Sequence, residues 1–427
     1  MITLITNDNY NYLINEKSGK YLCFYYEKKD EVIKGITNKK LKELFSNYEE
    51  FKNYLIDVKN SSVPINKKLK KMNYLILHSS DQCNLKCKYC YAEDNLCDNK
   101  NNYMSSETMI KSINKFYDND DFFVLFHGRE PLTNYNNIIE TIKHFKDNKK
   151  IHFIIQSNGL LLNDNKINEL KKYNVIINIS IDGIDDNHNV FRINGMKIDY
   201  TNRLKSIIEK YKVSPIIIVH KNNYKDLDKI SDYLIENNIT GASYNFLWPT
   251  KDNTILNDYV VPCDELFEQM KKVFDKSILN NKFIFKERDL YLLYGRILKR
   301  DFYNYMCNSA PCGAGVNCLS IYKDGEIYPC TMVNSQKENY LGTLDDSTED
   351  ILNRDVILKE RDINKIKDCK TCPLRCYCKG GGCAGFIYNL TNDINAKSLY
   401  CDYYYKMILY IMKRIKIMSK EKYFINY

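Results

Sequence analysis

Sixteen cysteines are the residues of this 427-residue chain whose type and spacing could do chemistry. The first group, Cys83, Cys87 and Cys90, forms a C-x3-C-x2-C loop that can present three thiolates to one 4Fe-4S cluster. A cubane has four irons, so one iron would lack a protein ligand. Such an open coordination position distinguishes a reactive metal site from a closed structural one. The loop therefore predicts a reactive metal centre, and a zinc knuckle that lacks its fourth ligand is the alternative.

The residues around this loop indicate which kind of metal site it forms. It follows the apolar run YLILHSS at 74–80, and the aromatic Tyr89 stands directly before its third cysteine, whereas Cys97 lies outside the spacing. The combination resembles the signature of the radical S-adenosylmethionine (SAM) superfamily. The resemblance implies that the open iron chelates the amino and carboxylate groups of SAM, and that the reduced cluster cleaves the sulfonium to a 5'-deoxyadenosyl radical.

Three later strand ends extend the resemblance. The stretch Phe126-His-Gly-Arg-Glu-Pro resembles the family's Gly-Gly-Glu-Pro, with Arg129 in place of the second glycine. Gln156-Ser-Asn-Gly resembles Thr-Asn-Gly, and Ser180-Ile-Asp-Gly followed by Arg192 resembles the Ser-x-Asp-Gly stretch that precedes an arginine. Hydroxyl, amide, carboxylate and guanidinium groups there could bind the SAM ribose and amino-acid moiety. The SAM contacts implied by the resemblance are Tyr89, Gly128, Glu130, Ser157, Asn158, Ser180, Asp182 and Arg192, and no general base is assigned.

The second cysteine region reads Cys312-x12-Gly-x4-Cys330, then Cys369-x2-Cys372-x5-Cys378-x4-Cys383, then Cys401. Gly325 would let the chain turn tightly between two short strands. The pattern resembles the SPASM domain, which carries two auxiliary 4Fe-4S clusters, although the family usually has three residues where four separate Cys378 from Cys383. The resemblance assigns Cys307, Cys312, Cys330 and Cys383 to the first auxiliary cluster, with Cys318 as alternative to Cys307. It assigns Cys369, Cys372, Cys378 and Cys401 to the second, with Cys376 as alternative to Cys378.

Two zinc sites are the alternative for this second region, because paired C-x2-C elements also bind zinc. A cysteine-rich segment with little apolar material of its own is expected to fold around metal. With three 4Fe-4S clusters and SAM, the expected protein is brown, whereas a zinc protein is colourless.

Six apolar runs between 74 and 248 are separated by segments of helical period, and five of them end in His, Ser, Asn, Asp or Gly. This alternation is typical of buried parallel strands whose carboxyl ends carry an active site. The expected fold class is α/β, a partial (β/α)6 radical SAM barrel. The expected parts are a small N-terminal domain at 1–72, the barrel at 73–250, a helical connector at 251–305, the SPASM domain at 306–405 and a C-terminal helix at 406–427.

Composition sets the broad class. The chain has 44% hydrophobic residues and a formal charge of +9, with lysine spread along most of its length, so a solvated basic surface is the simplest interpretation. The sequence shows neither a signal peptide nor an apolar stretch long enough to span a bilayer, and a cytosolic cysteine cluster more often binds metal than forms disulfides. We expect a cytoplasmic protein that has neither a membrane nor a nucleic acid as partner.

The resemblance implies an oxidoreductase that modifies a ribosomally made precursor peptide. Thioether crosslinking of the sactipeptide or ranthipeptide type is the first expectation, and oxidation of a Cys or Ser side chain to formylglycine by an anaerobic sulfatase-maturing enzyme is the alternative. A zinc protein that binds nucleic acid is the alternative of another class. Residues 1–72 could hold a leader peptide by strand addition or could be a structural cap. An external electron donor such as flavodoxin or ferredoxin is expected.

Overall fold

The architecture is that of a computed structural model, which describes residues 2–7, 10–15, 21–25, 72–90, 103–249, 254–280, 282–298, 307, 310, 312–333 and 336–419. Cys97 and residues 26–71 of the expected N-terminal domain lie outside these ranges. Among the helices of the described ranges, none is both long enough and apolar enough to cross a bilayer.

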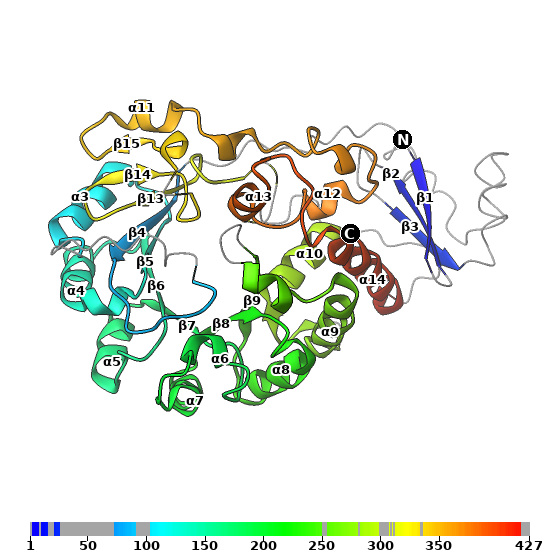
Figure 1. The fold of residues 1–427 in the computed structure, drawn as a ribbon, viewed down its shortest axis with the longest axis horizontal. Helices are drawn as coiled ribbons and strands as arrows, with labels where there is room; N and C mark the ends of the chain where they lie inside the picture. The colour runs from blue at the N-terminus through cyan, green and yellow to red at the C-terminus, as the bar shows by residue number, and fades with distance from the viewer. Residues whose placement is uncertain are drawn as a thin grey trace.

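Six parallel strands in sequential order form the centre of a ten-stranded sheet, as the apolar runs predicted. They are rich in Ile, Val and Phe, whose branched or aromatic side chains suit a pleated surface that is buried on both sides. Figure 1 shows the helices that follow these strands along the outer side of the sheet. The strands are β4 (Tyr74–Ser80), β5 (Phe122–Gly128), β6 (Ile151–Ser157), β7 (Ile176–Ser180), β8 (Ser214–Val219) and β9 (Gly241–Phe246).

The helices between these strands place their apolar faces on the sheet. Several begin at side-chain caps: the Ser105 hydroxyl accepts from the Thr108 amide, and Asn163 accepts from the Lys166 amide, which satisfies backbone donors that have no partner within the helix. The helices are α3 (Ser106–Phe116), α4 (Tyr135–His144), α5 (Asp164–Lys172), α6 (Val190–Ile193), α7 (Tyr200–Tyr211) and α8 (Leu227–Glu236).

The cysteine-rich region extends this sheet at its β4 edge. Strand β13 (Cys318–Ile321) pairs in parallel with β4, and β14 (Glu326–Tyr328) and β15 (Gly342–Thr343) follow it in antiparallel order. Gly325 has a φ of +80° in the turn between β13 and β14, as the sequence predicted. The barrel and the cysteine-rich region therefore share one sheet.

The connector at 251–305 also contributes to the sheet. It contains the helices α9 (Cys263–Lys276) and α10 (Arg288–Leu298), a hairpin of β10 (Ile278–Leu279) and β11 (Lys282–Phe283), and the strand β12 (Lys286–Glu287). Strand β12 pairs in parallel with β9 at the second edge of the sheet. The purely helical expectation was incomplete here, because a strand of two residues leaves no periodic signal in the sequence.

The rest of the cysteine-rich region is built from short helices that cross the side of the sheet opposite α4 to α8 (Figure 1). They are α11 (Thr348–Asn353), α12 (Arg375–Cys378) and α13 (Ala384–Thr391), together with short 3-10 turns. The chain then enters the long helix α14 (Cys401–Ser419), which begins before the expected position 406.

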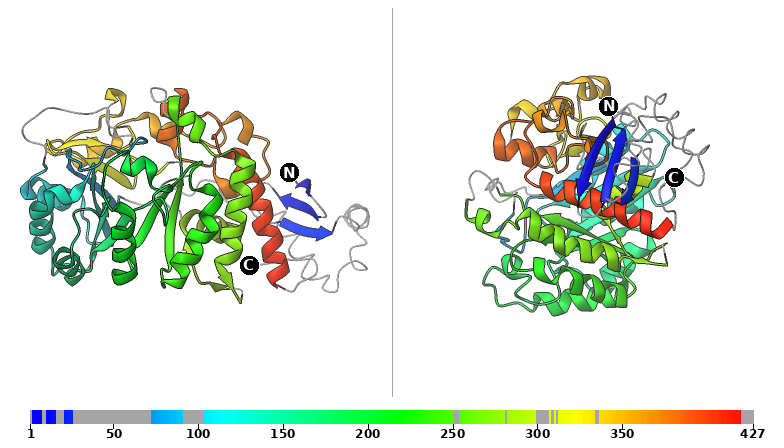
Figure 2. Two further views of the ribbon diagram at one scale, coloured as in Figure 1. Left: turned by 60° about the horizontal axis from the view of Figure 1, so that its bottom comes forward. Right: turned by 90° about the vertical axis from the view of Figure 1, so that its right-hand side faces the viewer.

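A three-stranded antiparallel sheet at the N-terminus rests on helix α14. The Tyr12 hydroxyl donates to the Leu409 carbonyl over 3.2 Å, and the Lys413 ammonium lies 4.7 Å from the centre of the Tyr10 ring. Figure 2 shows this sheet beside α14, at one end of the molecule. Its strands are β1 (Ile2–Asn7), β2 (Tyr10–Asn15) and β3 (Tyr21–Tyr25).

Candidate active site

A cavity of about 910 Å³ lies between the barrel and the cysteine-rich region. The loop that follows β4 contributes Cys83, Cys87 and Cys90 to its lining, and the cysteine-rich region contributes Cys307, Cys330 and Cys383. The ends of β5, β6 and β7 contribute to the cavity as well, in agreement with the rule that parallel strands place active-site residues at their carboxyl ends. The two cysteine regions, far apart in sequence, thus face one space.

The thiols of Cys83, Cys87 and Cys90 lie within electrostatic range of one another. The Leu85 amide donates to Cys83 Sγ over 3.4 Å, a contact that suits a thiolate ligand. Burial raises the pKa of Cys87 to about 12 and also raises the pKa of Cys83. These thiols would therefore stay protonated at neutral pH unless a metal displaced their protons, which is how metal binding couples to proton release.

Six of the eight residues implied for SAM line the same cavity, whereas the carboxylates of Glu130 and Asp182 lie behind its wall. Both carboxylates are completely buried and are bonded to protein donors. Their expected direct contact with SAM stays a prediction, and the geometry supports a positioning role for each. The six lining residues are Tyr89, Gly128, Ser157, Asn158, Ser180 and Arg192.

Glu130 fixes the strand ends beside the cysteine loop. Its carboxylate accepts from the Asn158 amide (2.7 Å), the Ser157 hydroxyl (2.8 Å) and the Leu132 amide (3.0 Å). Burial raises the pKa of this carboxyl even though these three donors oppose the shift. The Asn158 side chain in turn donates to Asn84 Oδ1 over 2.7 Å. Glu130 thus connects the end of β6 to the loop that carries Cys83.

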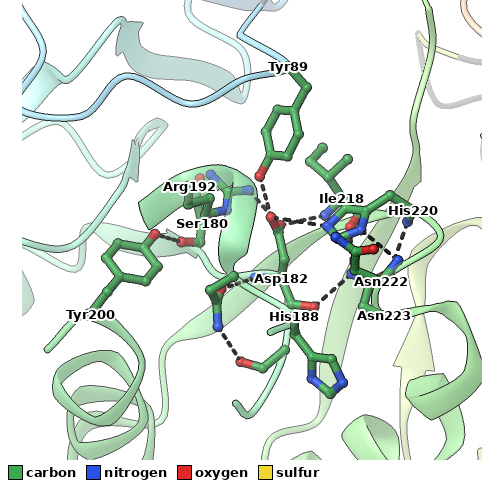
Figure 3. A network of polar contacts seen from close by, with 12 residues as sticks. Tyr89, Ser180, Asp182, His188, Arg192, Tyr200, Ile218, His220, Asn222 and Asn223 are labelled. Atoms are coloured by element: carbon green, nitrogen blue, oxygen red, sulfur yellow. Dashed lines mark hydrogen bonds and ion pairs between the residues drawn. The ribbon is translucent and has the colours of Figure 1, made fainter. Parts of the chain in front are cut away.

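Asp182 is the centre of a second buried network, drawn in Figure 3. Its carboxylate lies 2.9 Å from the Arg192 guanidinium and accepts from the Ile218 amide (3.0 Å) and from the Tyr89 hydroxyl. Burial alone would raise the pKa of Asp182, but the Arg192 charge and the donors lower it, so the carboxylate stays ionised. Because Tyr89 and Arg192 line the cavity, Asp182 orients two residues of its wall.

His220 and Asn223 belong to this network but were not singled out from the sequence. His220 Nε2 lies 3.8 Å from Asp182 Oδ2, and Asn223 donates to the Asp182 carbonyl over 2.8 Å. Both are completely or almost completely buried, at 0% and 1% exposure. The only sequence signal was their position after the apolar run of β8.

The first auxiliary set forms around Cys383. Cys307, Cys312 and Cys330 each lie within electrostatic range of the Cys383 thiol. Cys318 interacts with Cys312 and Cys307, but it sits on β13 and packs against Ile76 and Leu125 in a small apolar cluster. This arrangement favours Cys307 over Cys318 as a member of the set.

The second auxiliary set forms around Cys378. Its thiol lies within electrostatic range of Cys372, Cys369 and Cys401, and Cys401 interacts with the first two in turn. Cys376, by contrast, is 4% exposed and belongs to the main hydrophobic core. This arrangement favours Cys378 over Cys376.

The donors around both sets suit thiolate ligands. The Met332 amide donates to Cys330 Sγ over 3.3 Å, and backbone amides also donate to Cys312, Cys378 and Cys383. Within the described ranges, no three His, Cys, Asp or Glu side chains converge on one point as ligands of a single ion. The donor type and grouping fit iron-sulfur clusters, whose binding would draw the thiols together.

An aromatic wall and a charged pair complete the cavity, and the sequence did not reveal either. Trp248 stacks on Phe386 with 5.7 Å between ring centres and 2° between planes, and Tyr400 meets Trp248 edge-on. Arg288 and Asp289, at the start of α10, also line the cavity, with 2.9 Å from Arg288 Nε to Asp289 Oδ1. The cavity thus has a polar side near β5 to β7 and an aromatic side near β9.

Comparison with known proteins agrees with this geometry. The family model of the radical SAM superfamily matches residues 77–234, and that of an iron-sulfur cluster-binding domain, SPASM, matches residues 312–373. The chain is 25% identical over 362 residues to the cysteine-type anaerobic sulfatase-maturating enzyme of Clostridium novyi. This alignment covers 78% of this chain and 93% of that enzyme. It is 27% identical over 375 residues to the radical SAM cyclopropyl synthase TigE of Paramaledivibacter caminithermalis, covering 79% and 73% of the two chains.

Among solved structures, native anSMEcpe with bound AdoMet and Kp18Cys peptide superposes with a TM-score of 0.66 at 22% identity, over 82% of this chain and 99% of that chain. At this identity the likeness shows the fold alone. The first match contains Cys83, Cys87 and Cys90 and the second contains Cys330, so both matched segments contribute cysteines to the cavity. The protein is therefore a radical SAM superfamily enzyme with a SPASM domain, and its relatives include a sulfatase-maturating enzyme and a cyclopropyl synthase.

Proposed function

We propose that this enzyme oxidatively modifies a side chain of a ribosomally made precursor peptide, and that the product is a thioether crosslink of the sactipeptide or ranthipeptide type. The observation that carries the proposal is the shared cavity, which is lined both by Cys83, Cys87 and Cys90 of the barrel loop and by cysteines of the cysteine-rich region, Cys307, Cys330 and Cys383. A substrate side chain inside it would lie between a radical-generating site and an auxiliary site that could accept an electron or bind a thiol.

The residues present fit three 4Fe-4S clusters. Cys83, Cys87 and Cys90 would hold the first, with SAM in contact with the polar side of the cavity. When bound, this cluster and SAM supply a 5'-deoxyadenosyl radical that takes a hydrogen atom from the substrate. The first auxiliary cluster would be held by Cys307, Cys312, Cys330 and Cys383, and the second by Cys369, Cys372, Cys378 and Cys401.

The chain itself contributes positioning and a candidate base. Among the described residues, two carboxylates line the cavity, and one of them, Asp81, is bonded to His78 over 3.1 Å and lies 3.8 Å from the Lys323 ammonium. The other, Asp289, stands on the aromatic side of the cavity beside Arg288, where it could accept the proton that a cysteine or another substrate group releases. The stacked Trp248 and Phe386 would pack against the peptide and keep water out.

The proposed partners are a precursor peptide and an external electron donor such as flavodoxin or ferredoxin. The sheet of β1, β2 and β3 has β1 and β3 at its edges, and a leader peptide could add to such an edge through main-chain hydrogen bonds. We therefore propose residues 1–72 as the leader-binding domain. The peptide bound to anSMEcpe supports a peptide as the substrate class.

Formylglycine formation is the second candidate, and one observation favours it. The sulfatase-maturating enzyme of Clostridium novyi aligns with this chain over 93% of its own length, and thus along both the barrel and the cysteine-rich region. The two candidates share the clusters and the radical and differ in the fate of the substrate sulfur.

Mass spectrometry separates the two candidates. The reconstituted enzyme would be incubated anaerobically with SAM, dithionite and either a cysteine-rich peptide encoded beside its gene or a peptide with a sulfatase cysteine motif. A thioether retains sulfur and loses two hydrogens, whereas formylglycine loses the sulfur. We expect the first outcome with the gene-neighbour peptide, and conversion of the sulfatase peptide alone would replace the thioether proposal with the second candidate.

The variant Asp289→Asn probes the candidate base in the same assay. It should still form 5'-deoxyadenosine but give at least tenfold less product, since a positioned base contributes about 100-fold or more. Asp81→Asn is the matched control because Asp81 is the other carboxylate among the described residues that lines the cavity. An equal loss of product in Asp289→Asn and Asp81→Asn would show that Asp289 is not the base.

A further inference from the structure

Arg361 is the largest side chain that is completely enclosed among the described residues, at 1% exposure. Its guanidinium donates to three main-chain carbonyls, those of Ile394 (2.5 Å), Gly380 (3.0 Å) and Ala396 (3.3 Å). Its Nε has no hydrogen-bond partner, and no carboxylate of the described residues forms an ion pair with it. Arg361 is thus a buried cation that is held by dipoles alone.

Such a charge needs compensation. A buried ion loses several kcal/mol of hydration, so buried charges are normally paired or placed beside a metal centre. Arg192 illustrates the normal case in this same chain, because Asp182 lies 2.9 Å away as its counter-charge. Carbonyl dipoles orient the Arg361 guanidinium but leave its net charge in place.

The surroundings of Arg361 identify the compensating groups. Gly380, whose carbonyl it contacts, lies in the turn between Cys378 of the second auxiliary set and Cys383 of the first. Arg361 also lies within electrostatic range of Cys312 and Cys383 from the first set and of Cys369 and Cys378 from the second. Its charge therefore stands between the two sets of thiols.

We propose that Arg361 is the shared counter-charge of the two auxiliary clusters and holds the reduction potentials of both above the values they would have without it. The proposal rests on the cluster assignment of the proposed function. A cubane with four thiolate ligands is anionic and gains one more negative charge on reduction, so a fixed cation beside it favours the reduced form. Arg361 is a positioning residue, since it acts on the clusters and lies outside the cavity wall.

The test uses the full chain with Cys83, Cys87 and Cys90 changed to alanine, so that the auxiliary clusters alone titrate. Potentiometric titration followed by electron paramagnetic resonance gives their midpoint potentials, and Arg361→Gln is compared with the parent. We expect both midpoints to shift to more negative values at unchanged iron content. Arg375→Gln is the control, because Arg375 donates to the Lys370 and Cys369 carbonyls beside the second set only. In this variant we expect the midpoint potential of the second auxiliary cluster alone to shift, and by less than in Arg361→Gln.

Arg361→Lys keeps the charge and loses part of the hydrogen bonding. If the midpoint potentials stay near the parent values in this variant but shift in Arg361→Gln, the positive charge of Arg361 is what sets them. Unchanged midpoints in Arg361→Gln would overturn the proposal. If Arg361→Gln loses its clusters, retention of both in Arg361→Lys supports the counter-charge, and equal loss in the two variants shows a purely structural anchor. A parent without auxiliary iron would instead contradict the proposed cluster assignment, so the two failures are distinguishable.

Discussion

Arg129 stands where the radical SAM pattern has a glycine, directly after Gly128. Gly128 has a φ of +124°, and a Cβ atom on it would lie 2.5 Å from the Ser80 carbonyl oxygen, so this position requires glycine. Arg129 has no such requirement: its amide donates to the same carbonyl over 3.0 Å, a contact that any residue can make. Its side chain lines the cavity.

We expect Arg129→Gly to retain SAM cleavage, because the backbone contact to Ser80 survives the change. The measurement is 5'-deoxyadenosine formation under reduction, with Gly128→Ala as a control that should lose most of it. Complete loss of cleavage in Arg129→Gly would show that the guanidinium acts directly in the site.

The Asp182 pair makes a second prediction at this scale. Asp182→Asn should lower the free energy of unfolding by about 3 kcal/mol, because it leaves Arg192 buried without its partner. The control Asp164→Asn breaks an exposed pair with Lys210 and should lower the free energy of unfolding far less, because solvent screens that pair. Anaerobic denaturant titration measures both, and equal small losses would contradict the network.

The pH dependence of the same pair has a definite sign. Because the folded-state pKa of Asp182 lies below the ordinary value of 3.8, its stabilisation is fully present above that value and disappears as the pH falls through the folded pKa. Asp182→Asn should lack this acid-dependent component.

The sequence predicted the cysteines of the site but not the charged residues that surround them. Cys83, Cys87 and Cys90 are recognisable because one short loop carries all three, and their spacing is a local property. The roles proposed for Arg361 and Asp289 depend on packing between segments far apart in the chain, which residue spacing does not predict. The same holds for Glu130 and Asp182, whose motifs pointed to SAM but whose carboxylates face protein donors.

At the scale of elements, the hairpin of β13 and β14 joins the cysteine-rich region to the barrel. Its turn depends on Gly325, which adopts a φ of +80°, and a Cβ atom added there would meet no atom closer than 3.5 Å. The obstacle to a side chain at this position is therefore backbone strain and not crowding. Residues that tolerate the left-handed region should be accepted, and β-branched residues should not.

We expect Gly325→Val to lower the free energy of unfolding by about 1–2 kcal/mol, while Gly325→Asn should cost clearly less. Because Cys330 closely follows β14, the valine variant should also load less iron than the asparagine variant. Denaturant titration and iron analysis check both expectations. Equal stability of the two variants would show that the turn changes shape freely.

Periodicity predicted the long elements and gave no signal for a strand as short as β12. The six barrel strands have five to seven residues, and five of them end at or directly before the polar residues or glycines of the sequence. Strand β12, with two residues, forms at a sheet edge that offers unpaired backbone groups, which is a tertiary cause, whereas the two short strands around Gly325 were expected from the turn. The N-terminal sheet was also not predicted, since its Tyr-rich strands have no strict alternation.

At the scale of the whole molecule, the two cysteine regions should separate by function. After anaerobic reconstitution we expect about twelve iron atoms per chain, and about eight when Cys83, Cys87 and Cys90 are changed to alanine. The triple variant should make no 5'-deoxyadenosine. An iron content near four per chain in the parent would show that the auxiliary clusters are absent. Formation of 5'-deoxyadenosine by the triple variant would show that Cys83, Cys87 and Cys90 do not form the catalytic loop.

The complementary change, Cys369→Ala with Cys372→Ala, should leave some SAM cleavage and little modified peptide. Lost ligands also cost folding energy, so circular dichroism must first show a folded variant. Normal peptide modification in the folded variant would show that the second auxiliary set is dispensable.

Helix α14 begins at Cys401, which belongs to the second auxiliary set, and carries the N-terminal sheet at Leu409, about 12 Å along its axis. An unbroken helix of this length behaves as a stiff rod, so a displacement of the sheet along it would carry the Cys401 thiol with it. Amide hydrogen exchange should therefore find the first turns of α14 and the strands of the N-terminal sheet opening as one cooperative unit, mechanically linked across parts of the chain that are about 390 residues apart.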